Sequence, residues 1–365
     1  MPFIRLKIEV MHKFIALPEQ EKKIAFQKVA SAQGILPSIV EKDFWVCWVL
    51  RQIFDDAQLA KQITFKGGTS LSKAYQLIER FSEDIDLTIS KDAPYLTEGK
   101  NPMETGISGK ERARRIKTLK ENAQRYVAEL ALPTLERIFV GKLSHAGDWK
   151  LALDTSDPDR QTILFHYPKI FNYQQGLNFS NWTLGKSNFA VTEYIKPAVK
   201  LEFGARGDIE PSENKRITSY MAEAFPEIFD IPHSNVHVLA AKRTFWEKVT
   251  ILHALYHGTK MRDRMSRHYY DTFVMAQKGI ADAALQDTAL LEKVVRNKSL
   301  LFEDNKASYE TAIIGSLRLV PPSNIKADLA QDYAAMSEMF LRQSPSFESI
   351  MDSLSTLEQK INGTI

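Results

Sequence analysis

The chain has 365 residues, of which 44% are hydrophobic and 25% are charged. These values are typical of a globular protein, and they exclude a disordered chain, a collagen-like fibre and a long coiled coil. The 48 basic and 45 acidic residues give a formal net charge of +3, which is too small to indicate nucleic-acid binding without local clustering. The single cysteine, Cys47, cannot form an intramolecular disulfide.

Nothing in the sequence predicts a membrane segment. The apolar run 44–50 has seven residues, whereas a membrane-spanning helix needs about 20. Charges are scattered through residues 1–14, which therefore lack the basic start and clean apolar core of a secretory signal. We expect a cytoplasmic protein that contacts no membrane.

The first 90 residues predict helices followed by a strand, a turn, a helix and a second strand. Residues 17–56 carry apolar side chains at helical spacing and are expected to form a helical lead-in. Residues 63–65 and 84–89 have strand patterns. Between them, four apolar residues share one face of a helix, and they are Leu71, Ala74, Tyr75 and Ile78. We expect this helix to pack on the sheet.

The middle of the chain predicts a long loop, a basic helix and further strands. Residues 91–116 hold prolines and glycines among charges, as loops do, and the helix that follows runs to about Glu129. Strand patterns return at residues 149–153, 162–167 and 199–203. A mixed sheet is expected to close by about residue 206, and the chain after Pro211 is expected to be mostly helical.

The segment Lys66-Gly67-Gly68-Thr69-Ser70 joins paired glycines to the start of a helix. Glycine lets the backbone approach a ligand closely, and the amides of a first helical turn have no intrahelical partner, so a phosphate could bind there. A capped helix after a tight turn, without a ligand, is the alternative. The spacing is neither that of a Walker loop nor that of a Rossmann fingerprint.

Asp84 and Asp86 are two positions apart on a predicted strand, so both project from one face while Ile85 and Leu87 enter the core. Two neighbouring carboxylates repel one another, and Mg²⁺ relieves that repulsion while accepting oxygen ligands and phosphates. A solvated edge strand is the alternative. The order of strand, glycine turn, helix and acidic strand favours a nucleotide site.

The two motifs resemble the signature of DNA-polymerase-β-type nucleotidyltransferases, in the version carried by the nucleotidyl transferase AbiEii/AbiGii toxin family. The matching stretches are Lys66-Gly67-Gly68-Thr69-Ser70-Leu71 and Ser82-Glu83-Asp84-Ile85-Asp86-Leu87. Three further stretches match that family in order, and they are Val40-Glu41-Lys42-Asp43-Phe44-Trp45, Arg243-Thr244-Phe245-Trp246-Glu247-Lys248 and Arg267-His268-Tyr269-Tyr270-Asp271. The similarity spans about residues 35–275.

The resemblance implies an α+β fold with a polymerase-β-like nucleotidyltransferase core built on a mixed sheet. Together with the patterns above, it divides the chain into three expected parts. Residues 1–56 would form a helical lead-in packed on the core, residues 57–210 the core itself, and residues 211–365 a helical C-terminal domain.

The polymerase-β pattern includes a third carboxylate on a neighbouring strand. Alternation along residues 199–203 leaves Lys200 and Glu202 on the face opposite the core, so Glu202 is expected to complete a metal triad with Asp84 and Asp86. A solvated strand face is again the alternative.

The resemblance assigns Lys248 to a third motif and Asp271 to a fourth. It implies that Lys248 contacts the nucleotide phosphates and that Asp271 supports the site. Lys248 lies at the margin of the apolar stripe of its helix, which suits a lysine reaching into a cleft and equally suits one covering apolar surface. His253 and His257 lie four positions apart without a supporting cluster, so zinc is not expected.

Seven basic residues lie between positions 110 and 125, and they are Lys110, Arg112, Arg114, Arg115, Lys117, Lys120 and Arg125. Such a run is either a solvated helix face or a surface for RNA phosphates. Several aromatic residues could stack on unpaired bases or fill a core, and the core is favoured for most of Phe165, His166, Tyr167, Tyr173 and Trp182.

The sequence thus predicts a Mg²⁺-dependent nucleotidyltransferase that moves a nucleoside monophosphate from an NTP to an acceptor hydroxyl and releases pyrophosphate. Resemblance to the toxin family implies a role in growth arrest or phage defence, a cognate antitoxin, and an RNA acceptor such as tRNA. The alternatives are a non-catalytic NTP-binding sensor, a metal-dependent nuclease and a small-molecule nucleotidyltransferase.

Overall fold

A computed structural model of the chain describes residues 14–144, 146–171, 196–229, 232–258, 261, 263–302, 304 and 306–364. Its centre is a mixed sheet of seven strands, which are β1 (Ile63–Lys66), β2 (Asp84–Ile89), β3 (Lys150–Leu153), β4 (Thr162–His166), β5 (Val199–Gly204), β6 (Ser212–Thr218) and β7 (His233–Leu239). They lie in the order β3-β4-β5-β2-β1-β7-β6. The pairs β2–β5 and β1–β7 are parallel and the others antiparallel. The expected mixed sheet is therefore confirmed.

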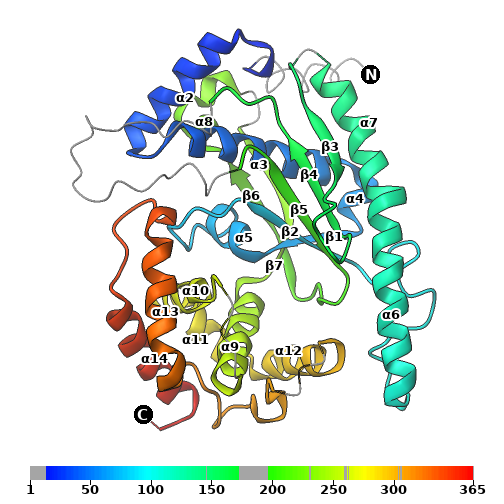
Figure 1. The fold of residues 1–365 in the computed structure, drawn as a ribbon, viewed down its shortest axis with the longest axis vertical. Coiled ribbons are helices and arrows are strands. Elements are labelled where there is room, and N and C mark those ends of the chain that lie inside the picture. The colour runs from blue at the N-terminus through cyan, green and yellow to red at the C-terminus, as the bar shows by residue number, and fades with distance from the viewer. Residues whose placement is uncertain are drawn as a thin grey trace.

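The helices form two groups around this sheet (Figure 1). The first accompanies the sheet and comprises α2 (Glu19–Gln33), α3 (Pro37–Asp55), α4 (Ala57–Ala60), α5 (Gly67–Lys73), α6 (Gly109–Tyr126), the π-helix η2 (Val127–Ala131), α7 (Leu132–Leu143), α8 (Tyr220–Ala224) and the short η4 (Pro226–Ile228). The second lies below the sheet in Figure 1 and comprises α9 (Ala241–His257), α10 (Ser266–Gln277), α11 (Ile280–Leu285), α12 (Thr288–Leu301), η5 (Tyr309–Thr311), α13 (Ser323–Ala335), η6 (Met336–Met339) and α14 (Phe347–Ile361).

Each group of helices has its own apolar core. In the first, α3 is buried along most of its length, and its apolar side chains share one core with Ile85 and Leu87 of β2. In the second, Phe245 and Trp246 of α9 pack with side chains from the later helices. The acidic residues of β2 point to the face away from α3, because side chains alternate along a strand. That face is where a site can form.

The sheet extends beyond the expected limit, because β6 and β7 follow residue 206. The expectation of a mostly helical chain after Pro211 is wrong at this point. Six of the seven residues of β6 are polar and only Ile217 is buried, as suits a strand at a sheet edge. A strand of this composition has no apolar pattern from which it could be predicted. We propose to divide the core from the helical part at about residue 240, in place of residue 210.

The helix after the glycine turn is shorter than expected. α5 ends at Lys73, and Gln76 has a left-handed backbone with φ of 52°. Leu71 and Ile78 join the core of the second helix group rather than packing on the sheet. The helical spacing of these apolar residues therefore does not correspond to a helix over residues 74–78.

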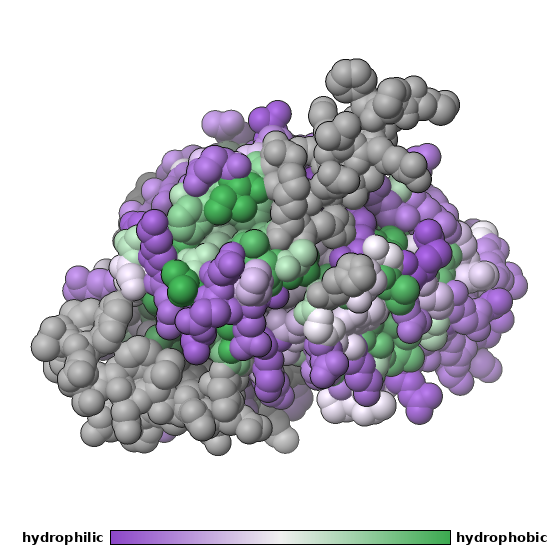
Figure 2. Space-filling model, turned by 90° about the horizontal axis from the view of Figure 1, so that it is seen from above, coloured by the Kyte–Doolittle hydropathy of each residue, from purple (hydrophilic) through white to green (hydrophobic). Residues whose placement is uncertain are grey.

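The basic helix begins earlier and continues further than expected. Ser108 caps α6 by accepting a hydrogen bond from the Glu111 amide, and the helix runs through η2 into α7. Among the described helices, none combines the length and apolar character that crossing a bilayer requires. Figure 2 shows hydrophilic side chains over much of the visible surface, with hydrophobic ones gathered in patches between them.

Candidate active site

The register of three central strands brings the predicted acids together. β2 lies between β1 and β5, where Asp86 pairs with Lys66 on one side and with Glu202 on the other. Asp84, two positions earlier, pairs with Lys200. Because neighbours in register point to the same face, the three carboxylates share the face opposite the core.

The two aspartates lie in an environment that disfavours their charge. Burial raises the pKa of Asp86 to about 6; Lys66 opposes this rise, and the charges of Glu202 and Asp84 add to it. Burial also raises the pKa of Asp84, and repulsion from Glu202 adds to the effect. The nearby cations Lys66, Lys200 and Arg267 therefore do not fully offset the burial of the two carboxylates, and a bound metal ion would favour their ionised form further.

The triad of acids is not assembled as a metal cage. Within the described ranges, no three carboxylate, imidazole or thiol side chains are grouped closely enough to hold a metal ion. The Glu202 carboxylate is paired with the ammonium group of Lys200 instead. Glu202 would therefore have to turn away from Lys200 before it could join Asp84 and Asp86 at a cation.

Gly67 lies directly against one of these carboxylates. Its backbone has φ of 81°, and a Cβ atom placed on it would lie 1.9 Å from Asp86 Oδ2. A Cβ atom on Gly68 would lie 2.7 Å from both Arg80 Nη2 and Ser82 Oγ. The two glycines are therefore required by close approach, and they bring the turn into contact with β2.

The hydroxyl groups of Thr69 and Ser70 donate hydrogen bonds to backbone oxygens. Thr69 Oγ1 donates to the backbone oxygen of Asp84 at 2.5 Å, and Ser70 Oγ donates to the backbone oxygen of Gly67 at 2.8 Å. Both side chains are fully buried. Each hydroxyl thus stabilises the turn, and the expectation that one of them contacts phosphate stays a prediction.

Lys248 and Asp271, the residues of the third and fourth motifs, form an ion pair. Lys248 Nζ lies 2.7 Å from Asp271 Oδ2. Arg80 donates to both oxygens of the same carboxylate, each at 2.8 Å. Burial opposes the ionised form of Asp271, but Arg80 and Lys248 hold its pKa well below the usual range. Sequence reasoning missed Arg80, which lies in an irregular segment before β2 and belongs to no motif.

Arg267 is a second residue whose role the sequence did not reveal. It lies on α10, and its positive charge acts on both Asp84 and Asp86. Its Nε atom is buried with no hydrogen-bond partner among the described residues. An unsatisfied guanidinium near two acids is suited to an anionic group bound between them. Its neighbour His268 is held neutral, because burial lowers its pKa well below the usual value.

The stretch at residues 40–45 is attached to the start of β2 and to α5 through ion pairs. Lys42 pairs with Glu83, the residue before Asp84. Asp43 forms a 2.7 Å ion pair with Lys73 of α5. These buried pairs attach α3 to the segment before β2 and to α5. They therefore help to position Asp84 and the glycine turn.

The basic helix carries less free charge than its sequence indicates. Glu111 binds both Arg114 and Arg115, and Lys120 lies 2.5 Å from Asp159. Lys117 is 80% exposed, with Glu121 3.9 Å away. Of the aromatic candidates, Phe165 and Tyr167 are buried in the core and His166 is exposed, while Tyr173 and Trp182 fall outside the described residues.

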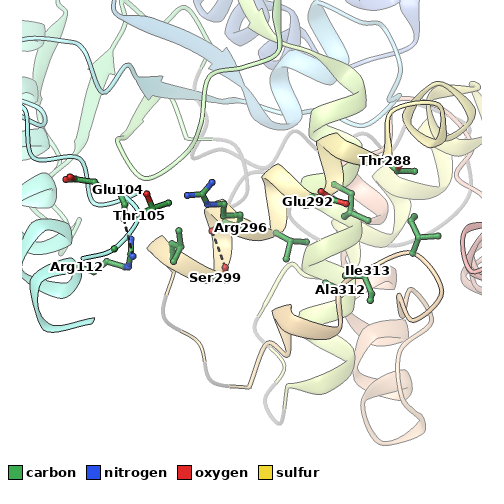
Figure 3. Close-up of a pocket in the computed structure, with 14 residues that line it drawn as sticks. Glu104, Thr105, Arg112, Thr288, Glu292, Arg296, Ser299, Ala312 and Ile313 are labelled. Carbon is green, nitrogen blue, oxygen red and sulfur yellow. Dashed lines mark hydrogen bonds between the residues drawn. The ribbon is translucent and has the colours of Figure 1, made fainter. Parts of the chain in front are cut away.

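A cavity opens beside Glu202, although neither Asp84 nor Asp86 lines it. It has a volume of about 400 Å³, and its walls include Lys66, Lys200, Glu202 and Arg206. This volume lies in the range of small-molecule sites. A larger cavity of about 830 Å³ lies between the loop at residues 104–106 and α12, where Glu104 and Arg112 face Arg296 and Ser299 (Figure 3). No acid of β2 lines that second cavity.

Comparisons with known proteins agree with the motifs. The model of the family described as "Nucleotidyl transferase AbiEii toxin, Type IV TA system" matches residues 48–353. No curated protein matches the sequence. Among solved structures, MenT4, a nucleotidyltransferase toxin from Mycobacterium tuberculosis H37Rv, is 14% identical, with 91% of this chain and 98% of that chain covered and a TM-score of 0.40. That likeness is too distant to identify an activity.

Proposed function

Because the chain belongs to the AbiEii family of nucleotidyltransferase toxins, which act in type IV toxin–antitoxin systems, we propose that it uses Mg²⁺ to transfer a nucleoside monophosphate from an NTP to a hydroxyl group of RNA. The bond between the α- and β-phosphates breaks, a bond from the acceptor oxygen to the α-phosphorus forms, and pyrophosphate leaves. The acceptor hydroxyl loses its proton in the same reaction.

The observation that carries this proposal is the convergence of Asp84, Asp86 and Glu202 on one sheet face beside Gly67. Carboxylate oxygens are the ligands that Mg²⁺ prefers, and the raised pKa values of the two aspartates fit a site that binds a cation. Asp84 and Asp86 would hold the metal, with Glu202 joining once it leaves Lys200. Bound Mg²⁺ would activate the acceptor hydroxyl and stabilise charge on the phosphates.

The cations around the acids would bind the triphosphate. Lys66 lies next to Asp86 in register, and Arg267 offers its unpartnered Nε. Gly67 and Gly68 would contact a phosphate through their backbone amides rather than through a side chain. Lys248 would share its ammonium group between Asp271 and a phosphate oxygen, and Asp271 would position it.

RNA is the proposed acceptor because basic residues continue from the site onto α6. Lys120 of α6 lines the cavity that Glu202 also lines, and Lys117 projects into solvent. A basic face beside the reacting phosphate would attract the backbone of a nucleic acid. We further propose that the protein acts in the cytoplasm, where NTPs are made, and that its growth-arresting activity serves phage defence and is opposed by a cognate antitoxin.

The experiment is incubation of the purified protein with each α-³²P-labelled NTP, total RNA and Mg²⁺, followed by electrophoresis and assay of pyrophosphate. We expect label on RNA and equimolar pyrophosphate. Asp84→Asn should abolish both, whereas Asp328→Asn, at an exposed position on α13, should change neither. Addition of EDTA should stop transfer by the wild-type protein.

Other results would identify other functions. Label on low-molecular-weight material would indicate a small-molecule nucleotidyltransferase. NTP binding without transfer to any component would indicate a sensor, and shortening of RNA in the absence of NTP would indicate a nuclease. Each of these outcomes contradicts transfer to RNA.

A further inference from the structure

Lys298 is a lysine of α12 whose ammonium group has no acidic partner. Its Nζ donates a 2.8 Å hydrogen bond to the backbone oxygen of Glu247, and no ion pair involves it among the described residues. A lysine without a counter-ion in a largely enclosed place is costly, because its charge has lost water and gained no carboxylate. Such a residue needs an explanation beyond packing.

Two contacts hold α12 against the segment that borders the site. Asn297 Nδ2 donates to the backbone oxygen of Arg206 at 3.2 Å, and the Arg206 guanidinium lies 4.6 Å from the centre of the Phe302 ring. The next residue, Gly207, approaches the ammonium group of Lys66 so closely that a Cβ atom there would lie 3.4 Å from Lys66 Nζ. These contacts attach α12 to the segment that carries Arg206 and Gly207, beside Lys66.

The charged groups around Lys298 are mostly positive. Those that act on it are Glu247, Lys66, Lys248 and Arg243. Glu247 is already bound by Arg243, and Lys248 is bound by Asp271. Lys66, like Lys298, forms no ion pair among the described residues. Lys298 of α12 and Lys66 of β1 therefore act on one another as like charges, and the carboxylate on which Lys66 acts is that of Asp86, a proposed metal ligand.

We propose that Lys298 binds the terminal phosphates of the nucleoside triphosphate together with Lys66, so that α12 supplies a phosphate contact that no sequence motif marks. This step rests on the proposed function, because it assigns a place to the pyrophosphate part of the same substrate. A polyanion between the two ammonium groups would satisfy both through charge-assisted hydrogen bonds.

The same arrangement couples phosphate binding to proton uptake. Burial lowers the pKa of Lys298 to about 7; Glu247 opposes this, while Lys66 and Lys248 add to it. The free protein at pH 8 therefore holds this lysine largely neutral. An anion beside it favours the charged form, so binding at pH 8 draws a proton from solution, and binding at pH 6 draws almost none.

Inorganic pyrophosphate with Mg²⁺ is the probe that tests this site without requiring catalysis. Titration calorimetry at pH 6 and pH 8, each in two buffers of different ionisation enthalpy, measures affinity and protons taken up. We expect wild type to take up close to one proton per pyrophosphate at pH 8. Lys298→Met should bind at least tenfold more weakly at pH 6 and take up none, and Lys66→Met should also bind more weakly.

Lys293→Met is the matched control, because Lys293 is exposed on the same helix. It should leave affinity and proton uptake unchanged, and Lys298→Arg should restore affinity while removing the pH dependence. Unchanged pyrophosphate binding in a folded Lys298→Met variant would overturn the role of Lys298. That result would leave the proposed function intact if Asp84→Asn still abolished transfer to RNA. Conversely, normal proton-coupled binding with no transfer from any NTP would overturn the proposed function alone.

Discussion

At Gly67 the backbone is left-handed, with φ of 81°, and no space separates it from the Asp86 carboxylate. We expect Gly67→Ala to lower the free energy of unfolding by about 1–3 kcal/mol through backbone strain. We also expect the folded variant to transfer more slowly than wild type, because Asp86 must move. Urea unfolding and initial transfer rates measure the two effects. Gly141→Ala is the control, because Gly141 lies in α7 with open space around it and should tolerate a methyl group. Equal activity of Gly67→Ala and wild type would contradict this reading.

Lys298 also predicts how stability varies with pH in the absence of nucleotide. Its folded pKa of about 7 lies below the ordinary lysine pKa of 10.5, so between these values the unfolded chain binds more protons and stability rises with pH. Lys298→Met removes the buried charge. We expect it to raise the free energy of unfolding at pH 7 by about 2–4 kcal/mol, and by progressively less towards pH 10. A gain that is constant across this range would contradict the assignment.

Among the elements, β2 decides which acids can act together, because it lies between β1 and β5 and fixes the register of both. α6 has a different role, since it extends along one side of the molecule (Figure 1) and its Lys120 lines the cavity that Glu202 also lines. Most of its basic side chains are paired with acids, so its attraction for RNA depends on the few that remain free.

Charge reversal on α6 tests that attraction. Lys110→Glu combined with Lys117→Glu places two acids on exposed positions of the helix. We expect the KM for RNA to rise about threefold to tenfold at low salt, with less effect as salt increases, and the KM for NTP to stay constant. The control is Lys61→Glu combined with Lys326→Glu, which makes the same charge change on exposed positions elsewhere. An unchanged KM for RNA would show that α6 does not contact the acceptor.

On the scale of the whole molecule, one buried ion network joins the two groups of helices. Arg80 precedes β2, whereas Asp271 and Lys248 belong to α10 and α9. The network therefore crosses from the sheet to the helical part. The two parts also share a covalent joint, since β7 leads directly into α9.

We expect Asp271→Ala to lower the free energy of unfolding by about 3–5 kcal/mol, because it leaves two buried cations without their counter-ion. Denaturant unfolding monitored by tryptophan fluorescence measures the loss, since Trp48 and Trp246 report on separate cores. The ion network holds the folded pKa of Asp271 low, so its stabilisation is present at neutral pH and is lost only as pH falls below about 4. Destabilisation below about 1 kcal/mol would mean that the network contributes little.

The sequence by itself determined the local parts of the site. Alternation with period two assigned Asp84 and Asp86 to one face of a strand, and the structure agrees. The paired glycines predicted a backbone that approaches a ligand closely, which stays a prediction, while the structure shows Gly67 against the Asp86 carboxylate. These inferences needed only residues a few positions apart, because strand periodicity and left-handed turns are properties of the local backbone.

Only the tertiary structure decided what lies far apart in the chain. The polar strand β6 had no apolar pattern, so its place at the sheet edge followed from pairing with β7. Arg80 reaches Asp271 across 191 positions, and Asn297 binds the Arg206 carbonyl across 91. Burial and the charges of distant residues set these roles, and neither quantity can be read from the neighbours of a residue in sequence.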